Sequence, residues 1–203
     1  MQITTWLALA ALCLLGAMTP GPSLALVLRQ TLGNGRAHGV TTALAHGAGV
    51  GLYALATVQG LALVLSSEPW LFRLLTWGGA GYLFWLGLQS LRASCGALDL
   101  PAGARAEPLW RSARVGLIVA LSNPHLAVFF LALFSQFVSP GMSLSCKLEM
   151  VLTAGLLDMG WYALVALALS HPALLPAMRR RMAAVQRLSG VAMLLLGLRV
   201  LTL

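Results

Sequence analysis

The chain has 203 residues, of which 59% are hydrophobic and only 9% are charged, and its formal net charge is +8. Soluble domains usually have about 45–50% apolar and about 25% charged residues, so a soluble fold of this size could not bury so much apolar surface. The positive charge does not indicate nucleic-acid binding, because the arginines lie in short connectors and no basic helix carries stacking aromatic residues. Composition therefore predicts an integral membrane protein whose solvent is the lipid bilayer.

Six apolar runs follow one another along the chain. Each is close to the roughly 20 residues that a helix needs to span about 30 Å of hydrocarbon. The runs cover residues 4–28, 39–66, 70–92, 113–138, 147–170 and 183–203. No basic segment precedes the first run and five runs follow it, so we expect a retained helix rather than a cleaved signal peptide. The pattern predicts an all-α membrane protein with six transmembrane helices.

Positive residues are distributed unequally between the connectors. Ten of the thirteen fall in alternate connectors: Arg29, Arg36, Arg92, Arg105, Arg111, Arg114, Arg179, Arg180, Arg181 and Arg187. Cytoplasmic connectors of membrane proteins are enriched in Lys and Arg. We therefore expect these connectors in the cytoplasm and both termini outside it.

The longest connector, residues 93–112, separates two groups of three predicted helices. These halves, about 1–92 and 113–203, form a single transmembrane domain over residues 1–203. Because each half has an odd number of helices, the second must cross the membrane in the opposite sense. The third helix ends in Leu86-Gly87-Leu88 and the sixth in Leu196-Gly197-Leu198. Interruptions in the first and fourth helices strengthen the prediction of an inverted repeat, which is typical of transporters.

The interruption of the first helix consists of Pro20, Gly21 and Pro22, followed by Ser23. Two prolines remove two amide donors, and a glycine permits unusual backbone angles. Inside a bilayer, the carbonyl groups that such a break frees must be satisfied by protein, water or ligand. The break indicates either a structural kink or part of a substrate site.

The fourth helix is interrupted at Asn123 and Pro124, with His125 next to them. At 1.5 Å per helical residue, this break and the one in the first helix lie at similar depths, so the two can face one another. Asn123 offers hydrogen-bond donors and an acceptor, and His125 can titrate. The alternative is that both side chains only bridge neighbouring helices.

Asp158 is the one acidic residue well inside a predicted span. A carboxylate at the bilayer centre costs about 2.5–3.5 kcal/mol, so it should face the protein interior or a wet cavity. We expect it to bind substrate or carry a proton, unless it is a neutral group bonded between helices. His46 lies among small residues that form a helix-packing face, and it is a further candidate for the proton step.

Motifs for cofactors, metals and catalysis are missing from the sequence. The three cysteines, Cys13, Cys95 and Cys146, form no Cys/His cluster that would bind zinc. The chain has no phosphate-binding loop, no GxSxG and no HExxH motif. The few polar residues inside the predicted spans do not suggest the converging nucleophile, base or metal ligands that an enzyme needs. We therefore expect no cofactor, no metal site and no enzymatic activity.

Several of these elements, in this order, resemble the LysE/RhtB family of amino-acid exporters over essentially the whole chain. They are the proline–glycine–proline triplet, the W-x-G-A-x-Y-L-x-x-L-G pattern from Trp77 to Gly87, Gly116, Asn123-Pro124, Phe129-Phe130, Gln136-Phe137, and Asp158 with Trp161 and Tyr162. The family often has Lys after the Asn-Pro pair, whereas this chain has His125. The second helix also lacks an acidic residue that some relatives have, so a cationic substrate such as lysine is less expected.

The resemblance implies export of amino acids or related metabolites across a bacterial inner membrane, coupled to inward proton movement, and it suggests a homodimer. Our working hypothesis is a secondary transporter with alternating access. The two breaks would hold the polar ends of the solute, and Asp158 would bind its amine or carry the coupling proton. The rival interpretations are a membrane enzyme, a non-transporting scaffold or accessory subunit, and a channel.

Overall fold

The protein is described here from a computed structural model that covers residues 1–19, 21–92, 107–169, 184 and 187–198. All regular elements within these residues are helices, as the sequence predicts. They are α1 (Ile3–Met18), α2 (Pro22–Asn34), α3 (Arg36–Ser67), α4 (Pro69–Arg92), α5 (Leu109–Ser122), α6 (Pro124–Phe134), α7 (Leu144–Leu169) and a helix over Arg187–Leu198. Most of the predicted linker, residues 93–106, lies outside the described part.

Both predicted interruptions separate one helix from the next. α1 ends at Met18 and α2 begins at Pro22, with an angle of 59° between them. α5 ends at Ser122 and α6 begins at Pro124, with an angle of 55°. Each proline occupies the first turn of its helix, where a missing N–H group costs no intrahelical bond. Pro20 itself lies outside the described residues.

Two described helices, α3 and α7, are long and apolar enough to cross a membrane, and the number rises to four if each bent pair is one span. α4 has 24 residues but does not meet the same hydropathy test, and the helix Arg187–Leu198 is shorter. In α4, Arg73, three tryptophans and several glycines lower the mean hydropathy. The protein is thus a multi-pass helical membrane protein, while the count of six spans stays a prediction.

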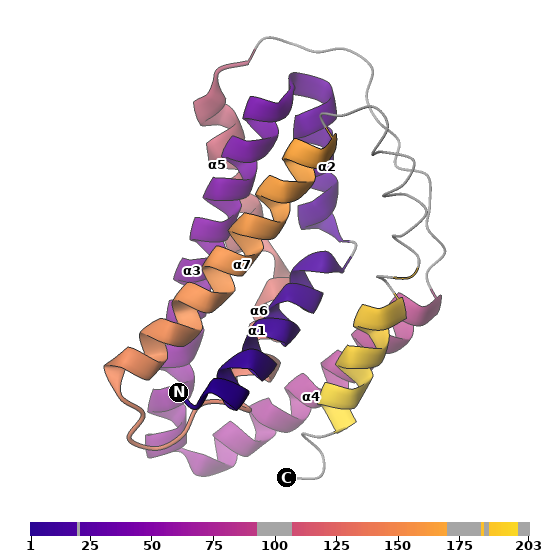
Figure 1. Ribbon diagram of the computed structural model, residues 1–203. Helices are drawn as coiled ribbons and strands as arrows, with labels where there is room; N and C mark the ends of the chain where they lie inside the picture. The colour runs from indigo at the N-terminus through magenta and orange to yellow at the C-terminus, as the bar shows by residue number, and fades with distance from the viewer. Residues whose placement is uncertain (20, 93–106, 170–183, 185–186, 199–203) are drawn as a thin grey trace.

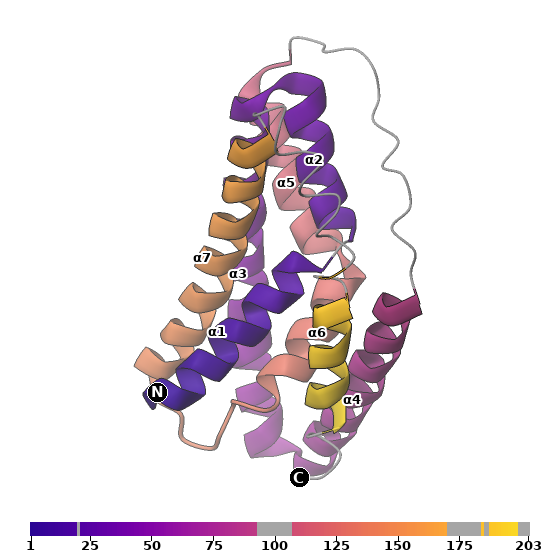
Figure 2. The same cartoon turned by 45° about the vertical axis from the view of Figure 1, so that its right-hand side comes forward.

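α3 and α7, called the central helices below because α1, α2 and α5 pack around them, run side by side, as Figures 1 and 2 show. α5 packs on α3, α1 packs on α7, and α2 contacts both central helices. On the other side of the bundle, α4 packs against α6. Large side chains such as Leu52, Leu156 and Leu164 point away from the bundle and are more than half exposed, as a surface that faces lipid requires.

The two central helices touch where both have glycine. A Cβ atom added to Gly47 of α3 would lie 2.5 Å from the Cβ of Met159 and 2.9 Å from the carbonyl oxygen of Gly155. These distances are too short for any side chain, so the backbones approach as closely as small residues allow. The small-residue stretch around His46 is therefore a packing face, as predicted from the sequence, and it presses α3 onto α7.

We expect Gly47→Ala to lower the free energy of unfolding by about 1–3 kcal/mol, because the new methyl group meets the backbone of α7. Gly60→Ala is the matched control in the same helix, since nothing lies within 4 Å of a Cβ added there. That variant should be as stable as the parent or more stable, because Ala favours a helix by about 1 kcal/mol over Gly. Denaturation of the purified protein in detergent measures both. Equal stability of the two variants would contradict the close contact.

Candidate functional site

A cavity of about 350 Å³ lies where the two helix breaks meet. Its wall is formed by the end of α1, the start of α2, the start of α6, the middle of α7, the last turns of α4, and Met193 from the C-terminal helix. Six of the nine candidate residues line it: Gly21, Pro22, Ser23, Asn123, His125 and Asp158. The two breaks, which the sequence places at similar depths, thus lie next to one another around one cavity.

Asp158 is buried between the central helices, and His46 is its partner. His46 Nδ1 lies 2.7 Å from Asp158 Oδ2, and His46 Nε2 lies 2.8 Å from the hydroxyl oxygen of Ser23. The His46 side chain has no exposed surface, and the side chain of Asp158 is 7% exposed. If the imidazole donates a hydrogen bond from Nδ1 to Asp158 and accepts one at Nε2 from the Ser23 hydroxyl, all three side chains are satisfied. The three side chains connect α2, α3 and α7.

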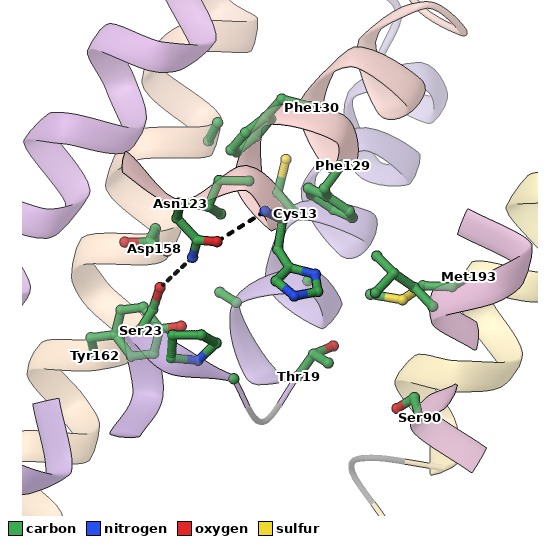
Figure 3. Close-up of a pocket in the computed structure, with 18 of the residues that line it drawn as sticks. Cys13, Thr19, Ser23, Ser90, Asn123, Phe129, Phe130, Asp158, Tyr162 and Met193 are labelled. Atoms are coloured by element: carbon green, nitrogen blue, oxygen red, sulfur yellow. Dashed lines mark hydrogen bonds between the residues drawn. The ribbon is translucent and has the colours of Figure 1, made fainter. Parts of the chain in front are cut away.

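Asn123 extends the hydrogen-bonded chain to the second break. Its side-chain oxygen accepts the backbone N–H of His125 at 3.0 Å, which caps α6, and its side-chain nitrogen donates to the Ser23 hydroxyl at 3.3 Å. Figure 3 draws both bonds. An N-cap residue normally satisfies only its own helix. Here the same side chain also bonds α2, so the two interrupted helices are joined through Asn123.

His125 faces the cavity from the first turn of α6, and its ring contacts α4. The hydroxyl oxygen of Tyr82 lies 2.7 Å from His125 Nδ1, and the two rings are 6.1 Å apart. The Tyr82 hydroxyl is therefore a hydrogen-bond partner of the residue that stands next to the Asn-Pro pair. This contact ties the second break to α4.

The remaining candidates lie outside the cavity wall or outside the described residues. His46 is behind the wall and is hydrogen-bonded to two residues that line it, Ser23 and Asp158. Pro124 is the first residue of α6 but does not line the cavity. Pro20 is not described. The roles assigned to all nine residues from the sequence remain predictions.

Tyr162 is a site residue that our reasoning from residue chemistry did not select. It lines the cavity, and its ring meets His46 edge-on at 5.3 Å with an interplanar angle of 86°. Tyr162 follows Asp158 by four positions on α7, so both side chains share one helix face. That spacing was the available signal. The pairing of Tyr82 with His125 had no comparable signal, because it joins two separate helices.

One expectation from the sequence is corrected by the structure. The deep polar groups were expected to form no convergent catalytic constellation. Ser23, His46 and Asp158 nevertheless form a chain in the order of a hydrolase triad, in which a carboxylate orients the imidazole and the imidazole contacts a hydroxyl. The spacing of these residues along the sequence could not predict the arrangement, because each residue comes from a different helix.

The cavity has a polar and an apolar side. Figure 3 shows Ser23, Asn123, Asp158 and Tyr162 together on one side, with Phe129 and Met193 across from them. In the described part of the lining, Asp158 supplies the one carboxyl group, and no Lys or Arg belongs to it. Among the described residues, no group of three or more potential ligands could hold a metal ion. The arrangement suits a small solute with a polar end and an apolar end.

Comparisons with known proteins agree on a single family. Residues 14–203 match the family model for LysE type translocators. A homoserine/homoserine lactone efflux protein of Salmonella typhimurium is 31% identical over 140 residues, which are 69% of this chain and 68% of the relative. The threonine efflux protein of Escherichia coli K12 is 28% identical over 182 residues, 88% of this chain and 86% of the relative. No solved structure matches the chain. The chain therefore belongs to the LysE type translocator family and is a transporter rather than an enzyme.

Proposed function

We propose that this protein is a secondary transporter that exports amino acids or closely related amino compounds across a bacterial inner membrane, in exchange for protons. The observation that carries the proposal is a cavity at two paired helix breaks with a buried carboxyl group in its wall. Interrupted helices that meet around a polar cavity are the usual substrate site of secondary transporters. Relatives named as threonine and homoserine efflux proteins support amino compounds as the substrate.

In this proposal the amine of the substrate binds Asp158 from the cavity side. The opposite side of the carboxyl group is held by His46, so the carboxyl keeps one partner when the cavity is empty. A proton and the protonated amine of the substrate would compete for the same carboxyl group. The protein could therefore exchange substrate for protons without a second acidic site. His46 and Ser23 offer a hydrogen-bonded path along which the proton leaves or returns.

Alternating access would come from movement of the half-helices about the two breaks. α1 and α6 lie on one side of the breaks, and α2 and α5 lie on the other. α1 contacts α6 closely, because a Cβ added to Gly16 would lie 2.6 Å from the ring of Phe129. The ring of Phe129 meets that of Phe130 edge-on, and the ring of Phe130 contacts that of Phe134 at a tilt, and all three are buried. We propose that this aromatic contact closes the cavity toward the outer side.

Two contacts between α4 and the C-terminal helix support the proposal of inverted halves. A Cβ added to Gly87 would lie 2.8 Å from the carbonyl oxygen of Gly190, and one added to Gly197 would lie 2.9 Å from that of Ala80. Gly87 and Gly197 are 110 positions apart in the sequence, and so are Ala80 and Gly190. A two-fold rotation that exchanges the helices would therefore exchange the two contacts. The homodimer and the division into halves at residues 92 and 113 stay predictions.

Hydrolysis is the activity that the order of Ser23, His46 and Asp158 would suggest if the geometry were considered alone. Transport is favoured for two reasons. The chain belongs to a translocator family, and the Ser23 hydroxyl already has both His46 and Asn123 as partners. A channel is separated from a transporter by saturable flux that depends on the proton gradient.

Replacing Asp158 by Asn tests the proposed function. The amide keeps the size of the side chain but neither carries the proton nor attracts an amine, so we expect efflux of threonine from preloaded vesicles to fall by more than about ten-fold. Glu149→Gln is the control on the same helix, because Glu149 is exposed at the far end of α7 and should leave the rate unchanged. Wild-type efflux by Asp158→Asn, with no dependence on pH, would remove this carboxyl group from the mechanism.

The orientation of the chain can be measured in intact cells. The α2–α3 corner, which contains Arg36, lies at the opposite end of the bundle from the start of α7 (Figure 1). In a background without native cysteines, we expect a membrane-impermeant maleimide to label Ser145→Cys and not Arg36→Cys, since both positions are exposed. The reverse pattern would place the arginine-rich connectors outside and contradict the predicted topology.

A fluorophosphonate probe separates transport from hydrolysis. Such probes react with a serine that an adjacent histidine activates. We expect no labelling of the purified protein, because Ser23 serves as a link in a proton path. Labelling that disappears in both Ser23→Ala and His46→Ala would instead assign a hydrolytic activity to this site.

A further inference from the structure

We propose that the cavity prefers primary amines whose carboxyl group is masked, as in an amide, an ester or a lactone, over the corresponding free amino acids. His125 is the residue that sets this preference. The inference rests on the proposed export function, because it takes Asp158 as the partner of the substrate amine.

The first argument is the charge of the cavity wall. Asp158 supplies a carboxyl group for the amine, but among the residues that the structure describes no Lys or Arg lines the cavity to receive a carboxylate. A free amino acid brings both charges, and only the positive one finds an opposite charge. A buried anion without a counter-charge is strongly disfavoured in apolar surroundings. Masking the carboxyl group removes that anion and leaves the amine unchanged.

The second argument is that three hydrogen-bond donors at the two breaks, Thr19, Ser23 and Asn123, are already engaged within the protein. The Thr19 hydroxyl donates to the carbonyl oxygen of Leu15 at 2.8 Å. The Asn123 amide donates to Ser23, and Ser23 has His46 Nε2 as a further partner. A carboxylate entering the cavity would have to break these bonds to gain a donor from any of the three.

The two helix starts are also poor anion sites here. The N-terminus of a helix normally offers several N–H groups to an anion. At α2 the first residue is Pro22, and at α6 it is Pro124, so each helix start lacks one N–H group. At α6 the next N–H, that of His125, is taken by the Asn123 side chain. The few N–H groups that remain at these helix starts suit one neutral carbonyl oxygen better than a carboxylate.

The third argument concerns what faces the substrate opposite the carboxyl group of Asp158. Phe129 and Met193 form an apolar wall there (Figure 3), and Leu126 and Phe130 add further apolar surface to the lining. A neutral amide or ester group can lie against such a wall at far lower cost than a carboxylate. His125 also lines the cavity, so a lysine at this position would bring a permanent cation into it.

Binding of two matched ligands tests the proposal. L-threoninamide and L-threonine differ only in whether the carboxyl group is masked, and both amines are largely protonated at about pH 7. We expect calorimetric titration of the full chain in lipid nanodiscs to give threoninamide a Kd about ten-fold lower, or more, than that of threonine. Equal affinities, tighter binding of threonine, or no binding of either compound would overturn the preference.

Variants of His125 identify the residue responsible. His125→Lys adds the missing cation, so we expect it to tighten threonine binding about ten-fold or more relative to threoninamide. His125→Gln adds no charge and should leave the order of the two ligands as in the parent. An unchanged ratio in a His125→Lys protein that unfolds at the parent temperature would refute the role of His125. If that variant does not fold, the ratio measured for the parent chain still decides the preference itself.

Asp158→Asn distinguishes failure of this inference from failure of the proposed function. Loss of binding for both ligands, together with threonine as the tighter ligand of the parent, would refute only the preference for masked carboxyl groups. Unchanged binding of both ligands to Asp158→Asn would refute the proposed role of Asp158, and with it the basis of the inference.

Discussion

A carboxyl group among membrane-spanning helices needs partners, and the bond between His46 and Asp158 supplies the main one here. At 2.7 Å it joins the two central helices, which can approach so closely because Gly47 and Gly155 face one another at their crossing. Ser23 then connects this pair to the first helix break. A buried polar chain of this kind is stabilising only when every member is satisfied. The packing of α2, α3 and α7 is thus held by Ser23 and Asp158, which line the cavity, and by His46 behind its wall.

The two breaks explain why a cavity exists at all in so apolar a chain. Continuous helices would satisfy their own backbone and pack without space between them, whereas prolines at residues 22 and 124 separate half-helices whose ends cannot pack as one rod. Asn123 bonds both break regions, and His125 with Tyr82 ties them to α4. Polar groups therefore collect where the backbone is irregular, while Phe129 and its aromatic neighbours fill the space on one side.

The sequence predicted the breaks, the buried acid and the helical class, because proline, an isolated charge and long apolar runs each leave a local signal. It did not predict which face of α3 meets α7, so His46 was expected first of all on a packing face, although that face also brings it to Asp158. The triad-like order of Ser23, His46 and Asp158 was missed for the same reason. Partners from separate helices depend on helix rotation and crossing, which periodicity does not determine when all sides of a helix are apolar.

The central claim is that water and solute reach the cavity at the paired breaks. Thr19 lines this cavity at the end of α1, so Thr19→Cys in a background without native cysteines reports access directly. A small water-soluble methanethiosulfonate reagent should modify this thiol, and an excess of threoninamide should slow the reaction several-fold. A thiol that never reacts, or one whose reaction no amino compound slows in a folded protein, would contradict a solute path through the breaks.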